Sequence, residues 1–174
     1  MRIGNGYASH RFDPERELVL GGIKIPDHAG LTGHSDGDAI IHAIIDSILG
    51  AASAGSIGSH FPPTDERWKG ADSVDLLRRA VRILNSRDYE VVNVDVTVVC
   101  ETPKIAPHAG KMAERISDAM SLNRNQISVK GNTNEGMGWI GAGEGIAVHA
   151  VALIEGLTGR RAGAADQPGG TWPL

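Results

Sequence analysis

Two histidines lie near acidic residues in an arrangement that could bind a metal ion. His10 follows the first predicted strand, and His42 lies inside the first predicted helix. Asp38 and Asp46 are one turn before and one turn after His42, on the same face of that helix. A carboxylate there could hold the second ring nitrogen of His42 and orient the ring toward a metal. Zinc normally takes three protein ligands, so two ordinary histidines are the alternative interpretation.

The polar segment 33–38, with the sequence GHSDGD, comes immediately before this helix and could bind an anion. Free backbone amides and the positive end of a helix dipole favour a phosphate at such a place. The alternative is a Gly/Asp turn that ends in a helix-capping residue, with Asp38 as the N-cap.

A third segment, 130–145, combines closely spaced glycines with hydroxyl, amide and carboxylate side chains. This combination suits a phosphate that is bound through a divalent cation, and a plain glycine-rich hairpin is the alternative. Lys104, at the end of a predicted strand, could supply a positive charge for a phosphate or could simply be solvated.

Predicted strands and helices alternate along the chain and would position these residues. Strands are predicted over 2–7, 17–25, 92–98, 126–131 and 145–155, the first two joined through Asp13-Pro14. Helices are predicted from 38 to about 50, after a capping Ser73, and over 107–121. Valines 92, 94, 96 and 98 should line the buried face of one strand. The irregular segment 55–72 is predicted to be a long functional loop.

Composition indicates one globular domain. The 174 residues are 41% hydrophobic and 22% charged, and the formal charge of −4 argues against a nucleic-acid binder. The single cysteine, Cys100, excludes an internal disulfide, and a small buried residue is favoured over a reactive thiol. No apolar run approaches the ~20 residues of a membrane span, and the start is unlike a signal peptide. We therefore expect a cytoplasmic protein without a membrane contact, with residues 158–174 as a mobile extension of a 1–157 domain.

Taken together, these segments resemble one family. The matching motifs are MRIG at 1–4, SHRF at 9–12, GHSDGD at 33–38 with His42, FP at 61–62, TD at 64–65, KGADS at 69–73, NVDV at 93–96, PK at 103–104, Gly141 and GEGIA at 143–147. In order and spacing they are similar to the 2-C-methyl-D-erythritol 2,4-cyclodiphosphate synthases of the non-mevalonate isoprenoid pathway. The resemblance spans about residues 1–157, essentially without gaps.

The resemblance implies a fold, an assembly and an activity. The fold would be an α/β domain of the α+β type, with a mixed β-sheet packed by helices on one side. The assembly would be a homotrimer with active sites between neighbouring subunits. The activity would be that of a lyase, which cyclises 4-diphosphocytidyl-2-C-methyl-D-erythritol 2-phosphate and releases CMP.

The resemblance also implies residue roles. His10 and His42 would bind Zn²⁺, and Glu135 would bind Mg²⁺ or Mn²⁺ together with the substrate. His34 and Thr133 would be catalytic. The substrate, a cytidine diphosphate derivative, would be bound by Ser35, Ser56, Ile57, Gly58, Phe61, Asp65, Cys100, Lys104, Ile105, Asn132, Asn134 and Trp139.

The chain departs from the family pattern at functional positions. Ala8 stands where the family has an aspartate as third zinc ligand, which leaves zinc occupancy open. Ser56 and Pro63 also replace aspartates, and Ala142 replaces an arginine that helps to bind regulatory isoprenoid diphosphates. The alternatives to an active synthase are a non-catalytic trimer that binds a nucleotide or phosphorylated metabolite, and a purely structural trimer.

Overall fold

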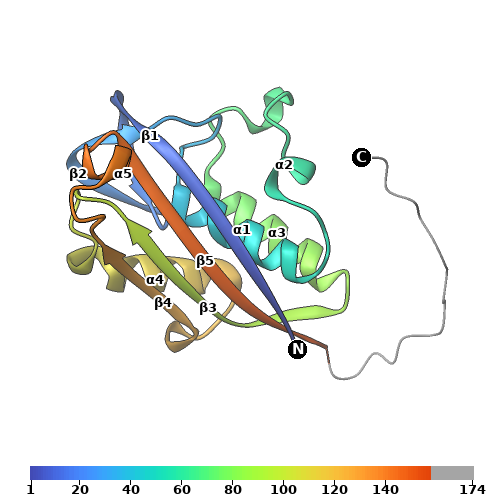
Figure 1. Cartoon of the computed structure of the whole chain (residues 1–174). Helices are drawn as coiled ribbons and strands as arrows, with labels where there is room; N and C mark the ends of the chain where they lie inside the picture. Colours follow the sequence, from blue (N-terminus) through green and yellow to red (C-terminus); the bar gives the residue numbers. More distant parts are fainter. Residues whose placement is uncertain (158–174) are drawn as a thin grey trace.

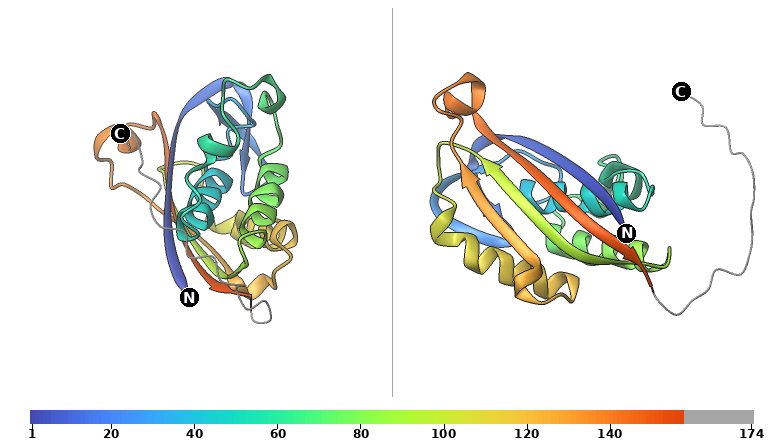
Figure 2. Two further views of the ribbon diagram at one scale, coloured as in Figure 1. Left: turned by 90° about the vertical axis from the view of Figure 1, so that its right-hand side faces the viewer. Right: turned by 60° about the horizontal axis from the view of Figure 1, so that its bottom comes forward.

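A five-stranded mixed sheet carries the long helices on one of its faces (Figures 1 and 2). The computed structural model describes residues 1–157, so the predicted extension at 158–174 lies outside the described residues. The strands are β1 (Arg2–Leu20), β2 (Ile23–Leu31), β3 (Tyr89–Val99), β4 (Ile127–Asn132) and β5 (Gly145–Gly156), in the order β2-β1-β5-β3-β4. Only β3 and β4 pair in parallel, which confirms the mixed sheet.

The helices on that face are α1 (Ala39–Ala51), α3 (Ser73–Asn85) and α4 (Ala106–Met120). The left view of Figure 2 shows all three on the same side of the sheet. Four short elements occupy the connections, namely α2 (Ile57–His60), η1 (Glu66–Trp68), η2 (Arg124–Gln126) and α5 (Gly138–Gly141). Helix α1 lies against β1 and β5, while α3 packs between α1 and α4.

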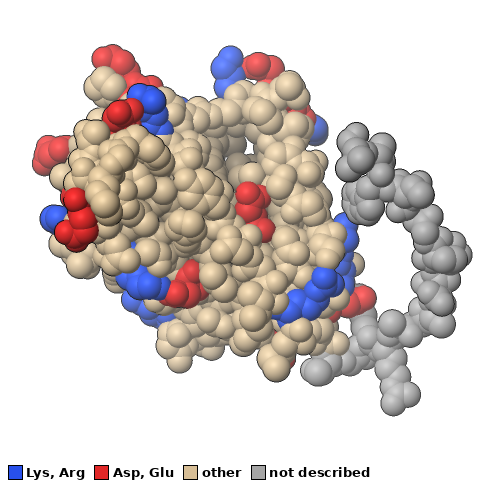
Figure 3. Space-filling model, viewed as in Figure 1, with Lys and Arg blue, Asp and Glu red and all other residues tan. Residues whose placement is uncertain are grey.

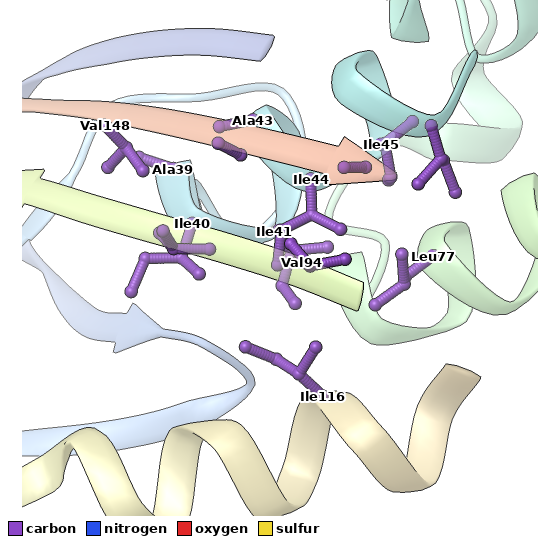
Figure 4. Packing of buried hydrophobic residues seen from close by; sticks show 14 of the residues in the cluster. Ala39, Ile40, Ile41, Ala43, Ile44, Ile45, Leu77, Val94, Ile116 and Val148 are labelled. Carbon is purple, nitrogen blue, oxygen red and sulfur yellow. The ribbon is translucent and has the colours of Figure 1, made fainter. Parts of the chain in front are cut away.

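Helix α1 is buried on nearly every side because it lies between the sheet and α3. Its five isoleucines have no exposed surface, as expected for a helix that is apolar all round. Val94 and Val148 cover it from the sheet, and Leu77 and Ile116 cover it from α3 and α4 (Figure 4). The strand β1 approaches closely because Gly6 has no side chain, and a Cβ there would lie 1.9 Å from a backbone oxygen of α1. This packing holds His42 in a rigid element.

The first strand is longer than predicted. Two strands were expected, over 2–7 and 17–25, but β1 runs without interruption to Leu20 and turns at Gly21-Gly22. Its first half pairs with β5, and its second half pairs with β2 from Phe12 onward, with an irregularity between Asp13 and Glu17. The Asp13-Pro14 signal therefore marks a bulge, where a missing N–H is tolerated, and His10 lies within the strand.

Strand β3 follows the predicted alternation with one shift. Val94, Val96 and Val98 are buried, but at the start of the strand Val91 is buried in place of Val92. The register against β5 slips between Val91 and Asn93, and such a bulge reverses the facing of the residues before it.

The segment 55–72 is not a structureless loop, since it contains α2 and η1. The next helix is capped by Asp72, whose carboxylate accepts the Val74 N–H, and not by Ser73 as predicted. Helix α4 begins and ends within one residue of its prediction.

Asp38 caps α1 as predicted, and it also holds the β1–β2 turn. Its buried carboxylate accepts the N–H groups of Ile41, Gly21 and Gly22 at 3.1, 2.9 and 2.6 Å. Asp38→Ala should therefore lower the free energy of unfolding by about 3 kcal/mol, because buried donors lose their acceptor. Thermal unfolding should show the loss, with the exposed Asp118→Ala as control. Equal melting temperatures for the two variants would contradict this role.

Candidate functional site

The His10 and His42 rings meet between β1 and α1. The Nε2 atom of His10 lies 3.1 Å from the Nδ1 atom of His42. The other nitrogen of His10, Nδ1, lies 2.6 Å from the carbonyl oxygen of Thr32. Because a carbonyl only accepts, His10 carries its proton on Nδ1, and the lone pair of Nε2 points toward His42.

His42 is oriented by two serines and not by the predicted carboxylates. Its Nε2 atom lies 3.0 Å from the Oγ atom of Ser35 and 3.1 Å from that of Ser73. Ser73 in turn donates its hydroxyl proton to Asp36. The expectation that Asp38 or Asp46 would hold this ring was wrong, because Asp38 caps α1 and Asp46 accepts the Ile57 N–H.

The facing nitrogens fit two ligands of one metal ion. Nitrogens about 2.0–2.1 Å from a tetrahedral zinc lie roughly 3.4 Å apart, close to the observed separation. The second nitrogen of each ring is hydrogen-bonded to the protein, and metal-bound histidines usually have such an outer-shell partner. Residues 1–157 contain no group of three or more His, Cys, Asp or Glu side chains placed to bind a metal. Ala8, on the same face of β1 as His10, contributes only a methyl group.

Burial keeps both rings neutral near pH 7. It is the main cause that lowers the pKa of His42 to about 4, and the neighbouring His10 adds to the shift. Burial also lowers the pKa of His10, against the opposing hydrogen bond to Thr32. Neutral imidazoles are the form that binds metals, so the site is ready for a cation without having to release a proton.

The lowered pKa of His42 predicts a loss of stability in acid. Between pH 6.5 and about 4 the unfolded chain takes up a proton that the folded ring refuses, so stability falls as pH falls. For metal-free protein we expect the free energy of unfolding to be about 2 kcal/mol lower at pH 5 than at pH 7. Urea titrations in the presence of a chelator should show this difference. In His42→Gln the free energy of unfolding should depend less on pH, while the control His108→Gln should behave like the parent. If both variants keep the pH dependence of the parent, His42 is not its cause.

A pocket of about 150 Å³ opens beside His42. It is lined by His34, Ser35, His42, Ile57, Gly58, Phe61, Pro63, Trp68 and Leu76. Among residues 1–157, two buried side-chain nitrogens have no hydrogen-bond partner, His34 Nε2 and Trp68 Nε1, and both residues belong to this pocket. Buried polar atoms are normally paired, so the Trp68 N–H group and the His34 Nε2 atom are candidates to bond a ligand. We call it the His34 pocket.

Side chains already bond two amides at the start of α1. Asp36 accepts the N–H group of Asp38, and Asp38 accepts that of Ile41. The carboxylates that hold these amides support the alternative of a turn with a capping residue. Arg16 fixes the segment further by donating to the carbonyl of Gly33.

A second pocket, of about 180 Å³, lies where β3 and β4 end side by side. Its lining is Cys100, Pro103, Lys104, Ile105, Ala106, Gly131, Asn132 and Thr133, and we call it the Lys104 pocket. The ends of parallel strands reach the same sheet edge, which is why these segments meet. A Cβ at Gly131 would lie 2.7 Å from Ile105, so glycine permits the close approach.

Burial raises the pKa of the Cys100 thiol to about 11, which supports its interpretation as a small apolar residue.

The structure thus gathers eleven of the predicted site residues into two pockets. Six more lie outside them within the described part of the chain, namely His10, Ser56, Asp65, Asn134, Glu135 and Trp139. Ser56 precedes α2, and Asp65 pairs with Arg67 at the surface. Trp139 lines a separate hollow of about 270 Å³ together with His10 and Glu144. The sequence did not indicate Thr32 or Ser73 as partners of the histidines, although Ser73 lies in the KGADS motif.

The site residues lie on a chain that similar proteins match over nearly its whole length. A family model described as the YgbB family matches residues 1–155. The 2-C-methyl-D-erythritol 2,4-cyclodiphosphate synthase of Symbiobacterium thermophilum is 54% identical over 156 residues, which cover 90% of this chain and 99% of the relative.

Solved structures agree with this match. The IspF protein of Plasmodium falciparum, in a CDP complex, has a TM-score of 0.78 at 38% identity, with 90% of this chain and 97% of that chain covered. The bifunctional IspDF of Campylobacter jejuni has a TM-score of 0.87 at 36% identity, with 90% of this chain and 42% of that chain covered. No helix within residues 1–157 is long and apolar enough to cross a membrane. The chain therefore belongs to the YgbB family, among relatives that are 2-C-methyl-D-erythritol 2,4-cyclodiphosphate synthases.

Proposed function

We propose that the protein is a cyclodiphosphate synthase of the non-mevalonate isoprenoid pathway. It would convert 4-diphosphocytidyl-2-C-methyl-D-erythritol 2-phosphate into 2-C-methyl-D-erythritol 2,4-cyclodiphosphate and CMP. The observation that carries the proposal is the 54% identity to a synthase over 99% of that relative's length. The cytoplasmic location expected from the sequence stays a prediction.

The two pockets suit the two ends of this substrate. The Lys104 pocket has an apolar floor and one ammonium group, which suit a cytidine base and its diphosphate, and a relative has been solved with CDP. The His34 pocket would take the phosphorylated erythritol, whose oxygens could accept from the unpaired His34 Nε2. Ser35 would hold the same phosphate in part through its hydroxyl.

The reaction forms one bond and breaks one bond at phosphorus. An oxygen of the 2-phosphate attacks the β-phosphorus, and the bond from that phosphorus to the bridging oxygen breaks, so that CMP leaves with the electron pair. Phosphoryl transfer depends mostly on alignment and charge neutralisation. The residues therefore act by holding the attacking phosphate and the diphosphate in line, with Thr133 and Lys104 on the diphosphate side.

His10 and His42 would hold a zinc ion, with water or substrate in place of the carboxylate that Ala8 lacks. Glu135 would bind Mg²⁺ or Mn²⁺, and Thr133 donates to its Oε1 atom at 2.9 Å. Bound metals would supply positive charge to the phosphate oxygens. Both metal assignments rest on the family resemblance and on the fit of the donor atoms.

A homotrimer is part of the proposal, and the uncovered face of the sheet supports it. Ile3, Tyr7 and Val151 are 73%, 49% and 42% exposed on the face that α1 does not cover. Figure 3 shows few charged groups across the middle of this face. Apolar exposure of this kind marks an interaction surface. Light scattering should give a mass three times the 18.3 kDa of one chain.

Turnover of the diphosphocytidyl substrate to CMP, with zinc and magnesium supplied, tests the activity. Product formation would support the synthase. CDP binding without any turnover would favour the alternative, a non-catalytic homologue. Ala8 supports this alternative, because its methyl group cannot bind a metal beside the histidine pair.

A further inference from the structure

The side chain of Glu101, which no sequence motif indicated, connects the glycine-rich turn after β4 to the end of β3 by hydrogen bonds. The Oε1 atom of Glu101 accepts the backbone N–H of Asn134 at 3.0 Å and that of Gly136 at 3.1 Å. Glu101 follows Cys100 at the end of β3, and it lies on the segment that forms one wall of the Lys104 pocket. The two hydrogen bonds therefore join segments that are 33 and 35 residues apart.

The backbone of this turn is not part of a sheet or a long helix, so Glu101 supplies acceptors that the turn itself does not have. Glu135 has a positive φ of 52° and Gly136 one of 73°, so the chain reverses sharply there. Inside the turn, Thr133 donates to the Glu135 carboxylate, and the Asn134 amide donates to the Met137 carbonyl. Glu101 is the contact that ties this local network to β3.

The turn carries the side chains that the proposed reaction uses at the diphosphate. Thr133 lines the Lys104 pocket, and Glu135 is the proposed ligand of the divalent cation. Lys104 lies on the other side of the pocket and is exposed, with its ammonium 3.4 Å from the Glu101 carbonyl. A rotation of the turn would therefore change the distance between the threonine hydroxyl and the lysine without disturbing the hydrophobic core.

We infer that Glu101 is a positioning residue, which sets the Thr133–Glu135 turn against the Lys104 segment and so fixes the geometry of the diphosphate site. This inference rests on the proposed function. Glu101 acts through the backbone of the turn and does not touch the reacting atoms. Its role needs an acceptor oxygen at this place and not a negative charge, so glutamine should replace it and alanine should not.

The test compares Glu101→Ala, Glu101→Gln and the control Glu114→Ala, an exposed position on α4. For Glu101→Ala we expect about a 10-fold weaker CDP affinity by calorimetry and a 10- to 100-fold lower kcat/KM, since small displacements are costly in aligned reactions. Its melting temperature should stay within a few degrees of the parent, because water can reach the freed N–H groups of an exposed turn. Glu101→Gln should recover most of both losses.

The outcomes separate this inference from the proposed function. If the parent protein turns over substrate and Glu101→Ala matches it in CDP affinity and kcat/KM, the positioning role is wrong. If Glu101→Gln is as impaired as Glu101→Ala, the charge matters and the acceptor argument is overturned. If the parent protein binds CDP but does not turn over substrate, the proposed synthase activity is wrong. The CDP affinities of the parent and of the Glu101 variants would still test whether Glu101 shapes the pocket.

Discussion

Ala8→Asp is expected to raise the affinity for zinc by about 100-fold or more. Position 8 lies two residues before His10 on β1, so both side chains leave the strand on the same side. The added carboxylate would join His10 Nε2 and His42 Nδ1 and complete a three-ligand site with one open position. Ala8 is partly buried, and burial strengthens the attraction between a carboxylate and a cation.

Competition with a chromophoric chelator measures this change directly. Asn125→Asp is the control, because it adds the same charge at an exposed position on η2, outside the histidine pair and outside the strands of the uncovered face. Turnover at limiting zinc should rise together with affinity in the Ala8 variant and stay unchanged in the control. Equal zinc affinity in the parent and in Ala8→Asp would show that two histidines suffice and that the missing ligand has no effect.

The helices and most strands could be predicted because their patterns are local. The isoleucine spacing of α1, its Asp38 cap and the valine alternation of β3 each reflect contacts within one element. The bulges in β1 and β3 could not be predicted, since they depend on how distant strands pair. The prediction of a connection between two strands at Asp13-Pro14 was wrong, because a proline within a strand resembles a turn when the partner strand is unknown.

The site was predictable in its residue types and not in its hydrogen bonds. His10 and His42 do face each other, but the partners that orient them, Thr32 and Ser73, come from segments far along the chain. Spacing on a helix placed Asp38 beside His42 correctly, yet its carboxylate is turned toward the N–H groups of the β1–β2 turn. Three backbone donors outcompete one imidazole for a buried carboxylate, because each donor would otherwise be unpaired.

Glu135→Gln should lower kcat by about 100-fold while leaving the fold intact. The substitution keeps the size of the side chain and an oxygen that can accept from Thr133, so the turn should hold its shape. It removes the negative charge that would attract a divalent cation, and hard cations prefer carboxylate oxygens to amide oxygens. Loss of that cation would leave the developing charge on the diphosphate without its neutralising partner.

The dependence on magnesium distinguishes this cause from a distorted turn. If Glu135 binds the cation, the half-saturating Mg²⁺ concentration should rise by roughly 10-fold or more in Glu135→Gln, and high Mg²⁺ should restore part of kcat. Glu114→Gln on α4 removes the same charge far from the turn and should match the parent. A lower kcat with an unchanged magnesium dependence would contradict the metal role, because the loss of the charge would then act in some way other than through the cation.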